Sequence, residues 1–153
     1  ALAQKYTRFK HFFFLGRNYM FPTALEGALK LKEISYIHAS AYPSGEMKHG
    51  SIALVDDELA VIGLLANKKT LEKSLSNLME VKARGAVILA LAEEGTTEAE
   101  AIAEDTLFLP KTIDELSCIS SSVAMQLLAY YVAKTLGTDI DQPKNLAKCV
   151  TVE

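Results

Sequence analysis

Cysteine, histidine and proline are scarce in this chain, and each shortage excludes a kind of protein. The two cysteines, Cys118 and Cys149, are too few for a disulfide framework. The three histidines, His11, His38 and His49, lack the spacing to cysteine or acidic residues that metal sites have, so we expect no bound metal. Only four prolines and eight glycines interrupt the 153 residues, which argues against a disordered chain.

An excess of charge of one sign and long apolar runs are also missing. The formal net charge is -3 and 23% of the residues are charged, so no basic field favours nucleic acid. The longest apolar runs are far shorter than a membrane span, and we find no signal peptide. We therefore expect a cytoplasmic protein that binds neither nucleic acid nor membranes. Because the chain begins with Ala1 rather than methionine, we also expect a fragment of a longer polypeptide.

Common nucleotide-binding and hydrolase motifs are absent as well. Gly16 has no partner glycines at the G-x-G-x-x-G spacing, and no G-x-x-x-x-G-K-[ST] occurs, so neither NAD nor ATP is supported. The sequence around Ser44, PSGE, is not the G-x-S-x-G of a nucleophile elbow. We expect no cofactor.

Apolar runs alternate with helical patterns along the chain, which is typical of βαβ units. The expected strands are buried runs at 12–15, 59–66 and 86–92, a shorter run at 106–110 and a weaker one at 39–42. The expected helices cover 19–37, 71–85 and 114–136, with a short helix between 93 and 105 and one helical turn within 46–52. Half of the residues are hydrophobic, enough for the core of one domain. The pattern predicts an α/β fold, a three-layer αβα sandwich with a mostly parallel sheet of about five strands.

The segment 16–50 concentrates titratable side chains. In open α/β sheets a ligand binds where a strand ends and the next helix begins, which here is the turn at Gly16. Asn18 is the expected N-cap of the helix that follows. Pro22 fits the first turn of that helix, where a missing N–H costs nothing.

Three charged residues form a ladder on this helix. Glu26, Lys30 and Glu33 are spaced at i, i+4 and i+7 and share one face. One interpretation is a solvated face on which each Glu–Lys pair contributes about 0.2–0.5 kcal/mol. The other is a proton-transfer pair, in which the ammonium orients and tunes a carboxylate base. Spacing alone does not decide between them.

Two stretches carry a resemblance to a known family. The first is residues 24–39 (ALEGALKLKEISYIHA) continued by 45–50 (GEMKHG), and the second is residues 137–148 (GTDIDQPKNLAK) with 150–153 (VTVE). They closely resemble the isomerase domain of the glutamine:fructose-6-phosphate aminotransferase family, the glucosamine-6-phosphate synthases. The similarity covers essentially the whole chain. It implies a flavodoxin-like sugar isomerase (SIS) fold and the second of two SIS subdomains.

The resemblance also implies roles for four side chains. Glu33 is then the base that moves a proton between C1 and C2 of the sugar. Lys148 is the amine that forms an imine with the open-chain ketose, and Lys30 is the partner of Glu33. His49 helps to open the sugar ring, reaching in from a neighbouring subunit. The charged ladder would then serve catalysis.

The same resemblance implies how the chain is divided and what it works with. Residues 1–137 are the second SIS subdomain and residues 138–153 an active-site tail. A glutaminase domain and a first SIS subdomain, whose hydroxyl-rich loop holds the sugar phosphate, belong to the same parent chain, which is expected to be a homodimer. The turn Gly16-Arg17-Asn18 lacks such hydroxyls. We therefore expect the fragment alone to make no glucosamine 6-phosphate from fructose 6-phosphate and glutamine.

Two other functions fit a domain of this type. One is a non-catalytic module that binds a sugar phosphate, which would need neither an enolising base such as Glu33 nor an imine-forming amine such as Lys148. The other is a phosphosugar isomerase or deaminase that has no glutaminase domain. An upstream sequence with or without an N-terminal cysteine distinguishes the latter from the aminotransferase.

Overall fold

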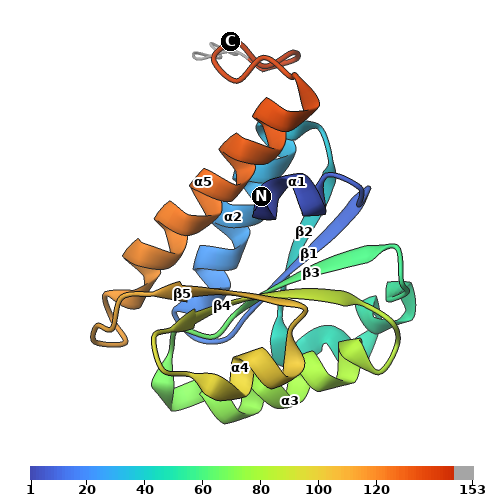
Figure 1. The fold of residues 1–153 in the computed structure, drawn as a ribbon. Coiled ribbons are helices and arrows are strands. Elements are labelled where there is room, and N and C mark those ends of the chain that lie inside the picture. The colour runs from blue at the N-terminus through green and yellow to red at the C-terminus, as the bar shows by residue number, and fades with distance from the viewer. Residues whose placement is uncertain (147–153) are drawn as a thin grey trace, which may run out of the picture.

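A computed structural model describes residues 1–146 and contains one sheet of five parallel strands (Figure 1). The strands are β1 (His11–Gly16), β2 (His38–Pro43), β3 (Leu59–Leu64), β4 (Val87–Glu93) and β5 (Asp105–Leu109). Their order across the sheet is β2-β1-β3-β4-β5, and every neighbouring pair is parallel. This is the flavodoxin-like order, in which the connection reverses direction between β1 and β3. The predicted sandwich is confirmed, and the weak stretch 39–42 is a full strand, β2.

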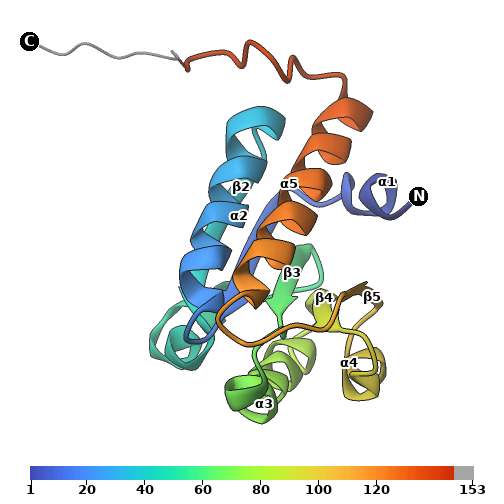
Figure 2. The same ribbon diagram turned by 90° about the vertical axis from the view of Figure 1, so that its left-hand side faces the viewer.

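Helices cover both faces of the sheet (Figure 2). One face carries α1 (Leu2–Tyr6), α2 (Met20–Ser35) and α5 (Ser117–Leu136), and the other carries α3 (Leu71–Lys82) and α4 (Thr97–Ile102). Three short 3-10 turns connect these elements: η1 (Ser44–His49), η2 (Ser51–Leu54) and η3 (Lys68–Thr70). Among residues 1–146, no helix combines the length and the apolar content needed to cross a membrane.

Alternation along β1 divides the core into two halves. Phe12 and Phe14 point into the cluster under α1, α2 and α5, whereas Phe13 and Leu15 point into the cluster above α3 and α4. All four side chains are nearly inaccessible to solvent. A strand buried on both faces reads as a continuous apolar run, which is why the sequence pattern located β1.

The start of α2 differs from the prediction. Asn18 is not the N-cap: that position belongs to Tyr19, without a side-chain hydrogen bond, and Asn18 has a left-handed φ of 51°. The turn is instead closed by the backbone, because Met20 N–H donates to the carbonyl of Arg17. Pro22 does lie in the first turn, as expected.

Several predicted boundaries also shift by a few residues. Helix α2 ends at Ser35 rather than at 37, β3 ends at Leu64 rather than at 66, and α5 begins at Ser117 rather than at 114. The helical turn expected within 46–52 is two 3-10 turns, η1 and η2.

Helix α5 buries small residues together with Met125, Leu128 and Val132, and it leaves several other large apolar residues exposed. Its buried side includes Ser117, Ser121, Ala124, Ala129 and Ala133. The large apolar residues whose spacing predicts the helix are between 39% and 60% exposed: Leu116, Ile119, Val123, Leu127, Tyr130 and Tyr131. The apolar periodicity thus located the helix correctly, but the residues that carry it lie on the exposed side.

Candidate functional site

The ladder on α2 forms a close ion pair near the carboxyl end of the helix. Lys30 Nζ donates to Glu33 Oε2 at 2.7 Å. About a third of the Lys30 side chain and a quarter of the Glu33 side chain are accessible, so the pair opens onto the surface. The structure contains a contact between Lys30 and Glu33, which the helical spacing allowed, and it leaves the Glu33 carboxylate partly accessible.

The protonation state of Lys30 restricts what it can do. The hydrogen bond to Glu33 raises the pKa of Lys30 and outweighs the opposing effect of burial. Glu26 on the previous turn adds a smaller contribution in the same direction. Lys30 therefore stays an ammonium at neutral pH and acts on Glu33 as a cation, not as a second base.

The segment after α5 is fastened beside this pair. Thr138 Oγ1 donates to the carbonyl oxygen of Ile34 at 2.6 Å, and Ile34 is the residue that follows Glu33. Lys144 N–H donates to Tyr36 Oη at 2.8 Å, and Lys144 Nζ lies 4.4 Å from the centroid of the Tyr36 ring. The beginning of the tail thus docks on the carboxyl end of α2, where Glu33 lies.

Lys148, the predicted imine-forming residue, lies outside the described residues.

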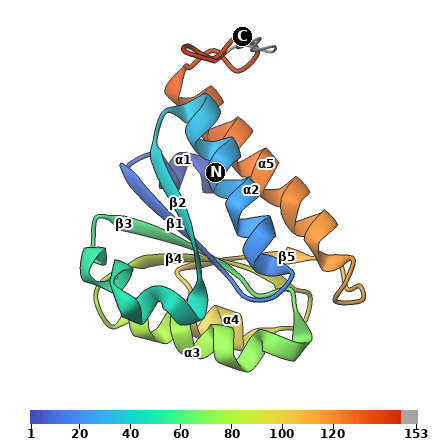
Figure 3. The same ribbon diagram turned by 180° about the vertical axis from the view of Figure 1, so that it is seen from behind.

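His49 is placed away from the Lys30–Glu33 pair of the same chain. It ends η1, which follows the carboxyl end of β2, whereas α2 ends beside the amino end of that strand (Figure 3). The six residues of β2 span about 17 Å. The His49 side chain is 74% exposed, and its Nε2 lies 3.9 Å from Glu46 Oε2. One chain therefore does not bring His49 and Glu33 together.

One contact holds η1, which carries His49, against α3, and a second holds the turn after β1 against the same helix. Lys48 Nζ lies 2.8 Å from Glu80 Oε1, and Arg17 Nε donates to Asn77 Oδ1 at 3.0 Å. The Arg17 guanidinium also passes close to Gly45, where a Cβ would lie 2.6 Å from Nη2. Arg17 thus joins the end of β1, the start of the η1 turn and α3.

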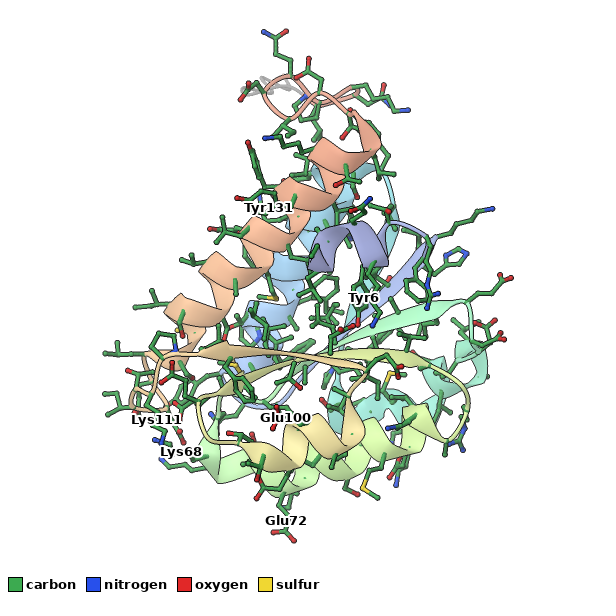
Figure 4. All side chains as sticks on the ribbon, viewed as in Figure 1. Tyr6, Lys68, Glu72, Glu100, Lys111 and Tyr131 are labelled. Atoms are coloured by element: carbon green, nitrogen blue, oxygen red, sulfur yellow. The ribbon has the colours of Figure 1, made fainter. Side chains whose placement is uncertain are left out.

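A polar cluster that sequence reasoning missed lies at the carboxyl ends of β3 and β4. Both oxygens of the buried Asp114 accept backbone hydrogen bonds from η3, from Lys68 N–H at 2.9 Å and Lys69 N–H at 3.3 Å. Lys68 also places Nζ 3.3 Å from Glu93 Oε2 (Figure 4 labels Lys68). Backbone N–H groups at this edge of an α/β sheet are a common anion-binding position. Here the chain fills that position with its own carboxylate, 46 residues away in sequence.

We expect Asp114→Ala to free the backbone N–H groups of Lys68 and Lys69 for an external anion. Two partly buried N–H groups would lose their acceptor, so the free energy of unfolding should fall by about 1–3 kcal/mol. Inorganic phosphate should restore part of that loss in the variant and leave the unchanged chain unaffected, as thermal unfolding at constant ionic strength would measure. Glu115→Ala, at the exposed neighbouring position, is the control. Equal phosphate responses in the two variants would contradict the assignment.

The described residues 1–146 contain no group of three or more His, Cys, Asp or Glu side chains placed to hold a metal ion.

Comparison with known protein families identifies the class of α/β domain to which this fold belongs. The family profile described as "SIS domain" matches residues 5–136. The chain belongs to the SIS domain family.

More specific relatives account for the two resembling stretches. The chain is 55% identical over 152 residues to the glutamine–fructose-6-phosphate aminotransferase [isomerizing] of Thermus thermophilus, covering 99% of this chain and 25% of that protein. It superimposes on the C-terminal domain of glucosamine-fructose-6-phosphate aminotransferase from Francisella tularensis with a TM-score of 0.87, at 43% identity, covering 92% of this chain and 40% of that one. The resemblance inferred from the sequence is confirmed. The chain spans about a quarter of the length of the curated relatives it matches.

A second enzyme is similar at greater distance. Glucosamine-6-phosphate deaminase from Thermotoga maritima superimposes with a TM-score of 0.78 at 28% identity, covering 99% of this chain and 44% of that chain. The fold therefore does not by itself separate an aminotransferase from a deaminase.

Proposed function

We propose that this chain is the sugar-isomerase part of an aminotransferase that makes glucosamine 6-phosphate from fructose 6-phosphate and glutamine. The similarity to aminotransferases over 99% of the chain supports this activity. The observation that carries the proposal is the docking of the tail on α2: Lys144 is fixed to Tyr36, three residues after Glu33. Lys148 is the fourth residue after Lys144, a separation that spans at most about 14 Å in an extended chain.

In the proposed reaction Lys148 and Glu33 act in succession. The amine of Lys148 attacks the carbonyl carbon C2 of the open-chain ketose, and water leaves as the imine forms. The imine makes the C–H bond at C1 more acidic. Glu33 then removes a proton from C1 and returns one to C2, after ammonia from glutamine has replaced the lysine at C2. Glu33 is protonated after the first transfer and becomes a carboxylate again after the second, so the two transfers together return it to its starting state.

Lys30 and His49 have supporting parts in the same proposal. The Lys30 ammonium keeps the Glu33 carboxylate in one direction through their 2.7 Å hydrogen bond. His49, which is exposed and distant from Glu33 of its own chain, serves the site of a neighbouring subunit by helping to open the sugar ring. This part requires a homodimer of the parent protein.

The proposal also covers the division of the chain. Residues 1–137 form the second SIS subdomain and residues 138–153 the active-site tail, within a cytoplasmic parent that also has a glutaminase domain and a first SIS subdomain. The Asp114 carboxylate already binds the backbone N–H groups of Lys68 and Lys69, where an anion would otherwise bind. This supports placing the sugar phosphate in the other subdomain.

Borohydride trapping with fructose 6-phosphate tests the function. The parent protein and this chain are each reduced in the presence of the sugar, and tail peptides are mapped by mass spectrometry. We expect a sugar adduct on Lys148 in the parent and none in the isolated chain, which should also make no glucosamine 6-phosphate. Sugar binding by the parent without an adduct on Lys148 would favour the non-catalytic module. An adduct in a parent that has no glutaminase cysteine would favour the isomerase or deaminase.

A further inference from the structure

An apolar groove lies between α5, α1 and the strands β4 and β5. Its volume is about 510 Å³. Leu89 of β4 and Leu107 of β5 belong to its floor, Leu127 and Tyr131 of α5 form one wall, and Leu2 of α1 forms part of the other. Figure 4 shows Tyr131 on the side of α5. Among the described residues that line the groove, the hydroxyl-bearing side chains are those of Ser120 and Tyr131, and the rest are apolar.

The groove is a gap in an otherwise complete layer. Parallel sheets are normally covered by helices on both faces. On this face α2 and α5 pack over the other strands, whereas beside the groove the added cover from the described residues is the five-residue helix α1. In consequence Leu127 and Tyr131 are each 51% exposed. Because helices cover the rest of this face, one more helix would complete the layer.

We propose that the occupant of this groove is an amphipathic helix of the parent chain, immediately upstream of Ala1. The relatives are about four times as long as this chain, so their polypeptide continues well beyond it. Leu2 and Ala3 line the groove, so a segment that precedes Ala1 in a longer parent would start from the edge of the groove. A helix with an apolar face at 3.6-residue spacing, seated on Leu89, Leu107 and Leu127, would complete the layer. This inference does not depend on the proposed activity.

The shape of the groove favours this occupant over a second copy of the chain. A twofold dimer places the same surface on both sides of its interface, so that surface must fit itself. A concave groove floored by strands and walled by two helices needs a convex partner, and its own copy presents another groove. A single helix from upstream supplies the convex shape.

Photo-crosslinking in the full-length parent tests the proposal. The photoreactive residue p-benzoylphenylalanine is placed at position Leu127, and in a control at position Met79, which is 58% exposed on α3 in the opposite layer. An average helix of about 10–14 residues and a connection of about 2–8 residues put the expected contact within about 30 residues upstream of Ala1. We expect position 127, but not position 79, to cross-link to that peptide of the same chain.

Any other result overturns the proposal. A cross-link between two differently isotope-labelled chains would identify a second copy as the occupant. A cross-link to a remote part of the same chain would identify another domain, and a yield no higher than at position 79 would show an open groove. As a second measurement, Leu127→Ser should lower the unfolding temperature of the parent more than Met79→Ser does, because only Leu127 would be covered there. Equal shifts would contradict the inference.

Discussion

Glu33→Gln in the full-length parent is expected to reduce the rate of glucosamine 6-phosphate formation by about 10²–10⁴-fold, the range for loss of a general base. Glutamine has nearly the same shape as glutamate and can still accept the hydrogen bond from Lys30, so the change removes the base without creating a cavity. Hydrolysis of glutamine and binding of fructose 6-phosphate should be retained. The initial rate at saturating sugar, compared with the glutaminase rate in the same sample, measures the effect.

Glu26→Gln is the matched control for this prediction. Glu26 belongs to the same helix face and is partly buried like Glu33, but its carboxylate only adds to the field at Lys30. Its replacement should change the rate by less than about threefold, an effect of the size expected from a weak helix-surface charge pair. A Glu33→Gln enzyme that retains more than a tenth of its activity, or a Glu26→Gln enzyme equally impaired, would remove the reason to treat the ladder as a proton-transfer pair.

The sequence predicts the sheet well because its physical signal is local. Each central strand is buried on both faces, so β3 and β4 appear as uninterrupted apolar runs. The helices between them are long and periodic. Boundaries are less certain because they depend on contacts made in the folded state. The start of α2 shows this: a backbone hydrogen bond from Met20 to Arg17 closes the turn, and Asn18 is not used as a cap.

The same distinction between local and long-range contacts applies to the candidate site. Lys30 and Glu33 are three residues apart on one helix, so helical spacing alone predicts that their side chains can meet. Arg17 and Asn77 are 60 residues apart, and Lys68 and Asp114 are 46 apart. No periodicity links such positions, because their proximity comes from the crossing of strands and helices. For Asp114 the available signal was its place just before a long helix, which does not reveal that its carboxylate binds the backbone of the 3-10 turn η3.

The position of α2, and with it the direction of Glu33, depends on a close approach at Gly16. A Cβ on Gly16 would lie 2.1 Å from the carbonyl oxygen of Met20 and 2.4 Å from its carbonyl carbon. Both atoms belong to the backbone of the first turn of α2, so no side-chain rotation can relieve the clash. Since α2 is packed against α5 and β1, the helix cannot move away without losing buried contacts.

Gly16→Ala is therefore expected to lower the free energy of unfolding of this chain by about 3 kcal/mol, the upper part of the range for overpacking. Gly137→Ala is the contrasting variant. Gly137 has a left-handed φ of 73°, but a Cβ at this position would meet no described atom within 4 Å, so the variant should lose only about 1–2 kcal/mol from backbone strain. Urea unfolding of both variants separates the two costs. If Gly16→Ala is no more destabilising than Gly137→Ala, then α2 does not approach β1 as closely as the fold requires, and the placement of Glu33 relative to the tail would need another cause.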